Sequence, residues 1–394
     1  MCVIQEFGYV TSAVSALILQ WQVRQFFGEW SGNEEMVAER LRSLDSLRGI
    51  AAIGVAVFWH YQHFRPAESP FFREMYWFYQ YGWICVDFFF VLSGFVFSYV
   101  YGKRILEHGI SWRHFAMLRI SRLYPVFLVT TLLVAILQGV RHGLGMEFFI
   151  YPCNDAYHFL LNLVFLHSGW FEHGFSFNAP SWSVACEVTV YAIFFAILYW
   201  QGKQRGMAFA AMVFLGLFLE RALWEFPLLN TVMARAFLGF FMGCLTYLLH
   251  GRLLSAASSA KRRLLYLWLA AILLLCAMAA HAGHGLYGEH WQDVYVLILF
   301  PSAILFALHL PWFSRVLSLR PLTFLGDISY SVYLWHFPVQ LILVTGAGIG
   351  LWFFDPARKW GFFLYIVLTF LAGAISHHYE AKAQKWIRRK FSRQ

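Results

Sequence analysis

The chain has 394 residues, of which 60% are hydrophobic, 20% aromatic and only 13% charged, and its formal net charge is +9. Soluble globular domains carry about a quarter charged residues, so this composition excludes an ordinary soluble protein. The apolar residues come in repeated blocks of about 17–25 residues, a length that crosses a bilayer as a helix. We therefore expect an all-α, polytopic bundle of membrane helices.

The first 40 residues form a peripheral segment in this scheme. They lack the basic start and the small-residue cleavage site of a secretory signal peptide, and they either lie on the membrane surface or extend from the domain. The six cysteines are scattered without a CxxC pair, so neither a disulfide framework nor a zinc site is indicated. The transmembrane domain is expected over residues 41–380, and a basic cytoplasmic tail over 381–394.

Apolar blocks bounded by charge predict about ten membrane crossings. The block 158–167 is too short to cross and is predicted to be a re-entrant or interfacial helix. The ten crossings are expected near 47–64, 81–101, 121–140, 182–200, 206–221, 231–249, 264–282, 294–311, 326–347 and 361–378.

Lysine and arginine residues are concentrated in every second connection between these crossings. One set of connections, which includes both ends of the domain, holds 22 of them, and the other set holds 6. The positive-inside rule therefore places both termini in the cytoplasm, in a membrane that we expect to be a bacterial plasma membrane. The basic balance is explained by topology and by contact with anionic lipid, so no nucleic-acid partner is expected.

The long external connection, residues 141–181, is rich in His, Asn, Gly and aromatic residues. Such a loop suits a sugar-like acceptor, and it suits a plain packed lid equally well.

The first crossing begins with an arginine and ends with a histidine, in "RGIAAIGVAVFWH" (48–60). Ionisable groups in a span are costly and mark functional candidates. Arg48 either anchors at the lipid headgroups or takes part in a site, and His60 is either a catalytic base or a satisfied structural histidine.

The second and third crossings carry "DFFFVLSGFVFSY" (87–99) and "RISRLYP" (119–125). The Ser93-Gly94 pair favours close packing against another helix, and Asp87 adds a carboxylate near the external end. Arg119 and Arg122 share a helix face. Paired guanidinium groups bind phosphate, so a phosphorylated donor fits here; ordinary membrane anchoring is the alternative.

Three later stretches place polar groups inside spans. Glu187 in "SWSVACEVTVY" (181–191) needs a partner, and His60 is the obvious candidate, since the pair would act as a general base. "GDISYSVYLWHFPV" (326–339) carries Tyr330 and His336, the latter either a site residue or a core histidine. Arg235 lies deep enough to need a carboxylate or a ligand.

Together these stretches resemble the acyltransferase-3 family of integral membrane O-acyltransferases. The matching pieces occur in the family's order: "LDSLRGIAAIGVAVFWH", "VDFFFVLSGF", "RISRLYP", "PSWSVACEVTVY" and "LGDISYSVYLWHFPV". The resemblance implies transfer of an acyl group, often acetyl, from cytosolic acyl-CoA to a hydroxyl of a glycan, a glycolipid or a glycosylated small molecule. Acyl-CoA would be a co-substrate, with no bound cofactor and no metal.

The family's motifs assign roles residue by residue. The first-span motif falls on Arg48 and His60, the third-span pair on Arg119 and Arg122, and the Ser-Trp-Ser…Glu motif ends on Glu187. The resemblance therefore implies His60 and Glu187 as catalytic residues and the three arginines as the acyl-CoA site. Candidates for supporting roles are Asp45, Asp87, Ser93, Trp182, Ser183, Arg235, Tyr330 and His336.

One departure concerns the first-span motif. The family usually has ten residues between the arginine and the histidine, whereas this chain has eleven. On a regular helix the extra residue changes the angle between the two side chains from about 20° to about 120°. Either the helix carries a bulge or Arg48 lies in a loosely wound first turn.

The expected mechanism is direct attack of the acceptor hydroxyl on the thioester, with His60 as base; a covalent route through Ser183 stays open. A secondary transporter also has about ten spans and buried ionisable groups, but no internal repeat is evident. A lipid-binding scaffold would not need charged groups at both ends of one span.

Overall fold

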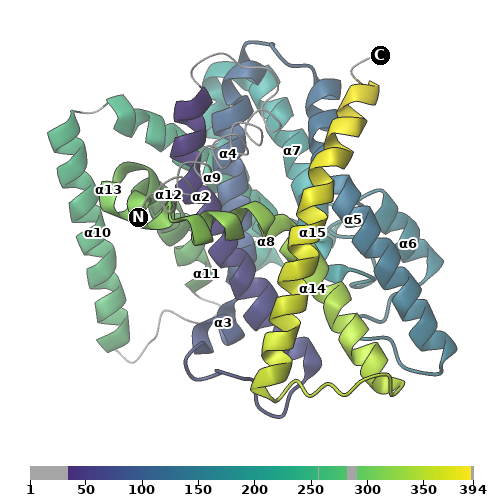
Figure 1. Cartoon of the computed structure of the whole chain (residues 1–394). Helices are drawn as coiled ribbons and strands as arrows, with labels where there is room; N and C mark the ends of the chain where they lie inside the picture. The colour runs from purple at the N-terminus through teal and green to yellow at the C-terminus, as the bar shows by residue number, and fades with distance from the viewer. Residues whose placement is uncertain (1–33, 256, 282–290, 392–394) are drawn as a thin grey trace, which may run out of the picture.

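The structure, a computed structural model, describes residues 34–255, 257–281 and 291–391, so residues 1–33 of the expected peripheral segment lie outside the described residues. Apart from the two-residue strands β1 (Glu225–Phe226) and β2 (Leu229–Asn230), its regular elements are helices (Figure 1). The longer ones are α2 (Glu34–Ile53), α4 (Ile84–Leu106), α5 (Trp112–Gly143), α7 (Trp182–Gln201), α8 (Arg205–Ala222), α9 (Thr231–Ser255), α10 (Ser258–His281), α12 (Phe300–His309), α14 (Arg320–Gly348) and α15 (Lys359–Phe391). Short ones are α3 (Tyr76–Tyr81), α6 (Ala156–Leu163), α11 (Gln292–Val294) and α13 (Pro311–Leu317).

Seven stretches of the described chain are long and apolar enough to cross a membrane, so the expected count of ten is not confirmed. Residues 179–222 form one of the seven, although α7 and α8 meet within it at the 3-10 turn Gly202–Gln204. The expected spans at 47–64 and 264–282 are not among the seven. The first belongs to a helix that begins in a charged run and loses its α-helical winding after Ile53, and the second reaches the edge of the described residues.

The short block at 158–167 contains the 8-residue helix α6, far below the roughly 20 residues that a crossing needs. The prediction that it does not span is therefore confirmed.

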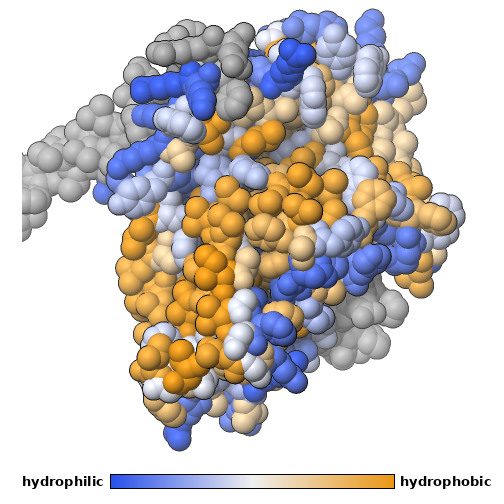
Figure 2. All heavy atoms as spheres, turned by 90° about the vertical axis from the view of Figure 1, so that its right-hand side faces the viewer, coloured by the Kyte–Doolittle hydropathy of each residue, from blue (hydrophilic) through white to orange (hydrophobic). Residues whose placement is uncertain are grey.

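The surface of the bundle fits a lipid environment. In the side view of Figure 2, hydrophobic residues form a broad area over the middle of the molecule, with hydrophilic residues gathered mainly at its ends. Ile136 on α5 and Ile375 on α15 are 63% and 59% exposed. A continuous apolar surface of this kind is unfavourable in water, so the chain is an integral membrane protein.

Close packing at glycines brings the functional helices together. A Cβ on Gly49 would lie 2.7 Å from the backbone of Gly326, so α2 and α14 are nearly in backbone contact. A Cβ on Gly94 of α4 would lie even closer to the Phe240 carbonyl oxygen of α9, in agreement with the packing that the Ser-Gly pair predicted. Small residues permit such approaches between membrane helices.

The first predicted crossing changes its winding between the arginine and the histidine. After Ile53 the chain forms a π-helical segment, Gly54–Trp59, and then a 3-10 turn, His60–Phe64. A π-turn holds one more residue than an α-turn, so the extra residue is absorbed as a bulge.

The expected tail, residues 381–394, does not form a separate segment where it is described. Residues 381–391 continue α15, which runs almost the whole height of the bundle (Figure 1).

Candidate functional site

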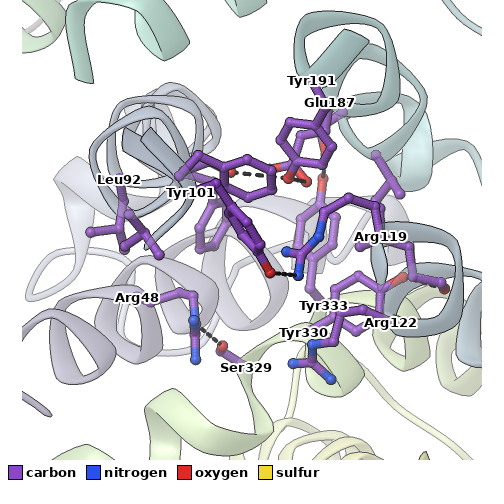
Figure 3. Close-up of a pocket in the computed structure, with 17 residues that line it drawn as sticks. Arg48, Leu92, Tyr101, Arg119, Arg122, Glu187, Tyr191, Ser329, Tyr330 and Tyr333 are labelled. Carbon is purple, nitrogen blue, oxygen red and sulfur yellow. Dashed lines mark hydrogen bonds between the residues drawn. The ribbon is translucent and has the colours of Figure 1, made fainter. Parts of the chain in front are cut away.

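Five helices meet at a cavity of about 140 Å³ that we call the arginine cavity. Arg48 comes from α2, Ser93 from α4, Arg119 and Arg122 from α5, Glu187 from α7, and Tyr330 from α14. Figure 3 shows Glu187 beside Tyr191 at the top of the cavity and the guanidinium groups below them. The structure therefore brings the three predicted arginines together with the predicted carboxylate.

Arg48 is held by α14 rather than extended toward the headgroups. Its Nε donates to Ser329 Oγ at 2.9 Å, and its Nη2 donates to the Gly326 carbonyl at 2.9 Å and contacts Asp45 at 3.0 Å. Three partners on one guanidinium fix its direction. The sequence could not decide between anchoring and a site role, and this geometry favours the site role.

Arg119 and Arg122 are also fixed by named partners. Arg119 donates to the Tyr101 hydroxyl, and its guanidinium carbon lies 4.9 Å from the ring centroids of both Phe97 and Tyr101. Arg122 forms an ion pair with Glu380 of α15 and lies 5.4 Å from the centroid of Tyr330. Aromatic faces attract cations, so both guanidinium groups are oriented in advance of any ligand.

Glu187 faces the arginines. The Tyr191 hydroxyl donates to its carboxylate at 2.6 Å, and Ser93 Oγ lies 3.0 Å from the same hydroxyl. Arg119 and Arg48 are the positive charges that act on it. The carboxylate therefore belongs to the arginine cavity.

A second cavity, of about 910 Å³, contains the predicted base, and we call it the histidine cavity. His60 and His63 line it together with aromatic residues of several elements. Those aromatic residues are Trp59, Trp83, Tyr151, Phe175 and Trp182.

His60 is the middle ring of a stack of three histidines. Its ring centroid lies 4.7 Å from that of His63 and 4.7 Å from that of His336, whose plane is inclined by only 3°. Gln340 donates to the His60 carbonyl, so its amide oxygen is the group that accepts from His63 Nδ1, at 3.0 Å. His63 Nε2 then accepts from Tyr151, at 3.3 Å.

In the part of the chain that the structure describes, only one ring nitrogen of His336 has a hydrogen-bond partner. Its Nδ1 donates to the Tyr333 carbonyl, which leaves Nε2 with the lone pair. Within the described chain, His336 Nε2 and His60 Nδ1 are buried and have no hydrogen-bond partner. His60 lines the cavity, so it is the ring of this pair that a substrate in the histidine cavity would meet.

The expected pairing of His60 with Glu187 is not found in the described part of the chain. The carboxylate is on the arginine cavity and accepts from Tyr191, whereas His60 is on the histidine cavity. The reason is the face of α7: Glu187 lies four residues after Ser183 and shares its face. Trp182 points to the other cavity.

A thin layer separates the two cavities. Ser183 and Tyr333 line the arginine cavity, and their hydroxyls lie 3.1 Å apart. Tyr333 also donates to the Pro180 carbonyl at 2.6 Å, and its own carbonyl is the acceptor for His336. These side chains, with Trp182 on the far side, form what we call the septum.

A proline in α14 explains how the septum is tied to the long loop. Pro338 has no N–H, which leaves the carbonyl four residues earlier, that of Leu334, without its helical donor. The Asn178 side chain donates to this carbonyl at 3.0 Å and to Thr130 at 3.0 Å.

The predicted need of Arg235 for a partner is met by Asp87. Its Nε donates to Asp87 Oδ1 at 2.8 Å, and its guanidinium carbon lies 5.1 Å and 4.9 Å from the ring centroids of Trp83 and Trp182. Arg235 forms part of the wall of the histidine cavity, as does Trp182 of the septum.

The long loop also contributes ordered groups outside the spans. Asp155 caps α6 by accepting from the His158 N–H at 2.9 Å, and this bond lowers the pKa of the carboxyl. His167 contacts Ser181 at 3.1 Å, and burial lowers the pKa of its imidazole to about 4.

Several residues at these sites were not predicted from the sequence. Tyr101 and Tyr191 lie in the sequence as part of aromatic spans, and Glu380 follows the last expected crossing, directly before the expected basic tail. The signal for Glu380 was a polar stripe, since Glu380 and Gln384 are both buried and are one helical turn apart.

Comparison with known proteins decides the family. The model of an acyltransferase domain, Acyl_transf_3, matches residues 41–378. The chain belongs to the acyltransferase-3 family. It is therefore an acyltransferase for groups other than aminoacyl groups, which favours the enzyme over the secondary transporter. No solved structure matches the chain.

The relatives with curated names are distant from this chain. Peptidoglycan O-acetyltransferase OatA of Listeria monocytogenes is 25% identical over 366 residues, which cover 86% of this chain and 54% of OatA. The putative membrane-bound transacylase BcsY of Komagataeibacter xylinus is 28% identical over 337 residues, 78% of this chain and 74% of BcsY. Protein 2 in the picA locus of Rhizobium radiobacter is 30% identical over 166 residues, 40% of this chain and 81% of that protein. This acyltransferase spans about half the length of OatA.

Proposed function

We propose that this acyltransferase is an O-acetyltransferase that moves acetyl from acetyl-CoA, bound at the arginine cavity, to a hydroxyl of a glycan in the histidine cavity. The observation that carries the proposal is the pair of cavities back to back at the septum, one lined by three arginines and the other by the histidines and aromatic rings.

The donor side matches a phosphorylated thioester. Guanidinium groups bind phosphate oxygens through paired hydrogen bonds, and Arg48, Arg119 and Arg122 are fixed around one opening. At about 140 Å³ the cavity is much smaller than the histidine cavity, so we expect it to take the thioester arm past Ser183, with the phosphates at the guanidinium groups.

The acceptor side matches a sugar. The histidine cavity, at about 910 Å³, is within the range of about 300–1,000 Å³ for ligand pockets. Its tryptophans offer flat apolar faces, and Glu220 and Gln292 offer hydrogen-bonding groups. OatA is named as a peptidoglycan O-acetyltransferase, which supports a glycan acceptor and acetyl as the acyl group.

The transfer itself balances without a covalent enzyme intermediate. His60 takes the proton of the acceptor hydroxyl, the hydroxyl oxygen bonds to the thioester carbonyl carbon, and the C–S bond breaks. The electron pair leaves on the CoA sulfur, and the proton held by His60 ends on the thiol. Because Tyr333 donates to Pro180, Ser183 is the donor in its contact with Tyr333, and Ser183 can turn this proton to the negative oxygen of the tetrahedral intermediate.

The Lys and Arg pattern supports an orientation with ten crossings. The arginine cavity then opens toward the cytoplasm, where acetyl-CoA is made, and both termini lie on that side. The histidine cavity faces outward from a bacterial plasma membrane, and the glycan enters there.

The test is acetyl transfer from radiolabelled acetyl-CoA to peptidoglycan or exopolysaccharide fragments by the protein in lipid nanodiscs. We expect His60→Ala to lower kcat by about 10²–10⁴ with CoA binding unchanged. Arg119→Gln should instead weaken CoA binding. Full transfer by His60→Ala would remove the assigned base, and absence of CoA binding by the wild-type protein would remove the assigned donor.

A further inference from the structure

The last turns of α15 lie outside the domain that defines the family. The family match ends at residue 378, whereas α15 continues to Phe391. Three polar residues of this continuation, Glu380, Gln384 and Arg388, are spaced four apart and so share one helix face. Glu380 and Gln384 are only 3% and 6% exposed. Buried polar side chains are unfavourable unless they have partners, so these residues are expected to contact other polar groups in the bundle.

Glu380 holds an arginine of the donor site. Its carboxylate pairs with Arg122 and accepts from Ser331 of α14 at 3.2 Å and from Gln384 at 2.8 Å. The side chains of Glu380 and Arg122 are 1% and 15% exposed. A carboxylate with several donors and almost no solvent is rigid, so the guanidinium it contacts is held in one place.

Arg388, two positions after Glu380 on the polar face, contacts α5, the helix that carries Arg119 and Arg122. Its Nε donates to Ser121 Oγ at 3.3 Å, and Ser121 lies between Arg119 and Arg122 in the sequence. The charge of Arg388 acts on both of those arginines. Guanidinium groups that gather in this way are suited to a ligand with several phosphates.

We propose that the end of α15, beyond the family domain, completes the donor site: Glu380 positions Arg122, and Arg388 adds a phosphate-binding group beside Arg119. The ligand class is the nucleotide end of acyl-CoA, with its pyrophosphate and 3′-phosphate. This inference rests on the proposed function, because it assigns the donor to the arginine cavity.

The direction in which Glu380→Gln changes the affinity for CoA distinguishes a positioning role from a simple effect of charge. Glu380→Gln removes a negative charge next to an anion site, so electrostatics alone would tighten CoA binding. Loss of positioning would weaken it instead. We expect the Kd for CoA to rise about tenfold, the loss of one charge-assisted hydrogen bond of about 1.5 kcal/mol. The KM for acetyl-CoA should rise with it, while kcat changes less.

The experiment measures CoA binding by calorimetry on the full chain in nanodiscs. In the Arg122→Gln background, Glu380→Gln should add less than about a twofold change, because both act through one group. Arg388→Gln should raise the Kd severalfold. Its matched control is Arg389→Gln, which removes the same charge from an exposed neighbour and should leave the Kd within about twofold, as expected for an exposed charge.

Each outcome decides one of the two claims. Equal or tighter binding by Glu380→Gln overturns the positioning role, and equal effects of Arg388→Gln and Arg389→Gln overturn the phosphate role and assign Arg388 to the lipid surface. Arg388 is only partly buried at a helix end, so its variant keeps the test open if Glu380→Gln does not fold. A wild-type protein without affinity for CoA contradicts the proposed function itself.

Discussion

Breaking the ion pair between Asp87 and Arg235 should unfold the bundle at a lower temperature. Asp87 of α4 is 1% exposed and Arg235 of α9 is 21% exposed, and Nε lies 2.8 Å from Oδ1. Removing one member of a buried pair costs about 3–5 kcal/mol, because the other charge stays buried without compensation. Arg235→Gln leaves the more deeply buried carboxylate with Gln292, at 3.2 Å, as its described donor, so we expect a loss of about 3–4 kcal/mol.

Asp87→Asn should cost less. The arginine that remains keeps the Trp83 carbonyl, at 3.2 Å, and two tryptophan faces. Cation–π contacts contribute about 0.5–2 kcal/mol each, so we expect a loss of about 2–3 kcal/mol. The double variant should lose less than the sum of the two single variants, because the second substitution removes the charge that the first left unpaired.

The assay uses the protein's own thiols. Cys85, Cys186 and Cys244 are buried, so a thiol-reactive fluorescent dye reports thermal unfolding of purified protein. Arg221→Gln is the matched control, since its ion pair with Asp293 lies on the same cavity but its side chain is 64% exposed. An exposed pair contributes about 0–1 kcal/mol. If Arg235→Gln unfolds no earlier than Arg221→Gln, or if the single effects simply add, the pair does not stabilise the α4–α9 contact.

Three further predictions concern the septum, the loop and the π segment. Ser183→Ala should lower kcat about 10²-fold with donor Kd unchanged, and an unchanged kcat in the transfer assay would remove its assigned role. Burial lowers the pKa of His167 to about 4, so the unfolded state binds a proton near pH 6.5 while the folded state does not. The contribution of this histidine to stability is therefore complete above pH 6.5 and is lost as the pH falls toward 4. His167→Asn should make the fall in Tm between pH 7 and pH 5 less steep. An unaltered slope would contradict this prediction. Deletion of Ala56 should keep activity because the π segment can relax to an α-helix, whereas insertion of one alanine after Ala56 should abolish it; equal transfer rates for the two would show that the bulge absorbs nothing.

The sequence picked out the charged residues that the structure brings together in the arginine cavity, whose role as a donor site stays a prediction. Arg119 and Arg122 are three apart on one helix, and no tertiary information is needed to see that they share a face. The carboxylate partner of Arg235 could also be expected, because an arginine at that depth is too costly to leave unpaired. Which carboxylate it was depended on how α4 packs on α9, because Ser93-Gly94 predicts close packing but not which helix packs there.

The pairing of His60 with Glu187 was predicted from their positions along the spans. It is not found in the described chain, because the two side chains line different cavities. The two residues can lie at similar depths and still face different cavities, because 3.6 residues per turn sets the face. Ser183 and Glu187 point one way from α7 and Trp182 the other. Glu380 escaped prediction for a different reason: a charged run after the last crossing reads as a solvated tail, and only packing against α5 and α14 shows that it is buried.

The septum also bears on the choice between direct transfer and a covalent route through Ser183. An activated serine needs a base within hydrogen-bond reach. The described partner of Ser183 is the Tyr333 hydroxyl, at 3.1 Å, and the histidine stack lies beyond the Tyr333 ring, with His336 at 5.7 Å from its centroid. Since His60 lines the cavity that we propose for the acceptor, the shortest proton path would start from the acceptor hydroxyl. The geometry therefore favours a single displacement, with Ser183, positioned by Tyr333, serving the carbonyl oxygen.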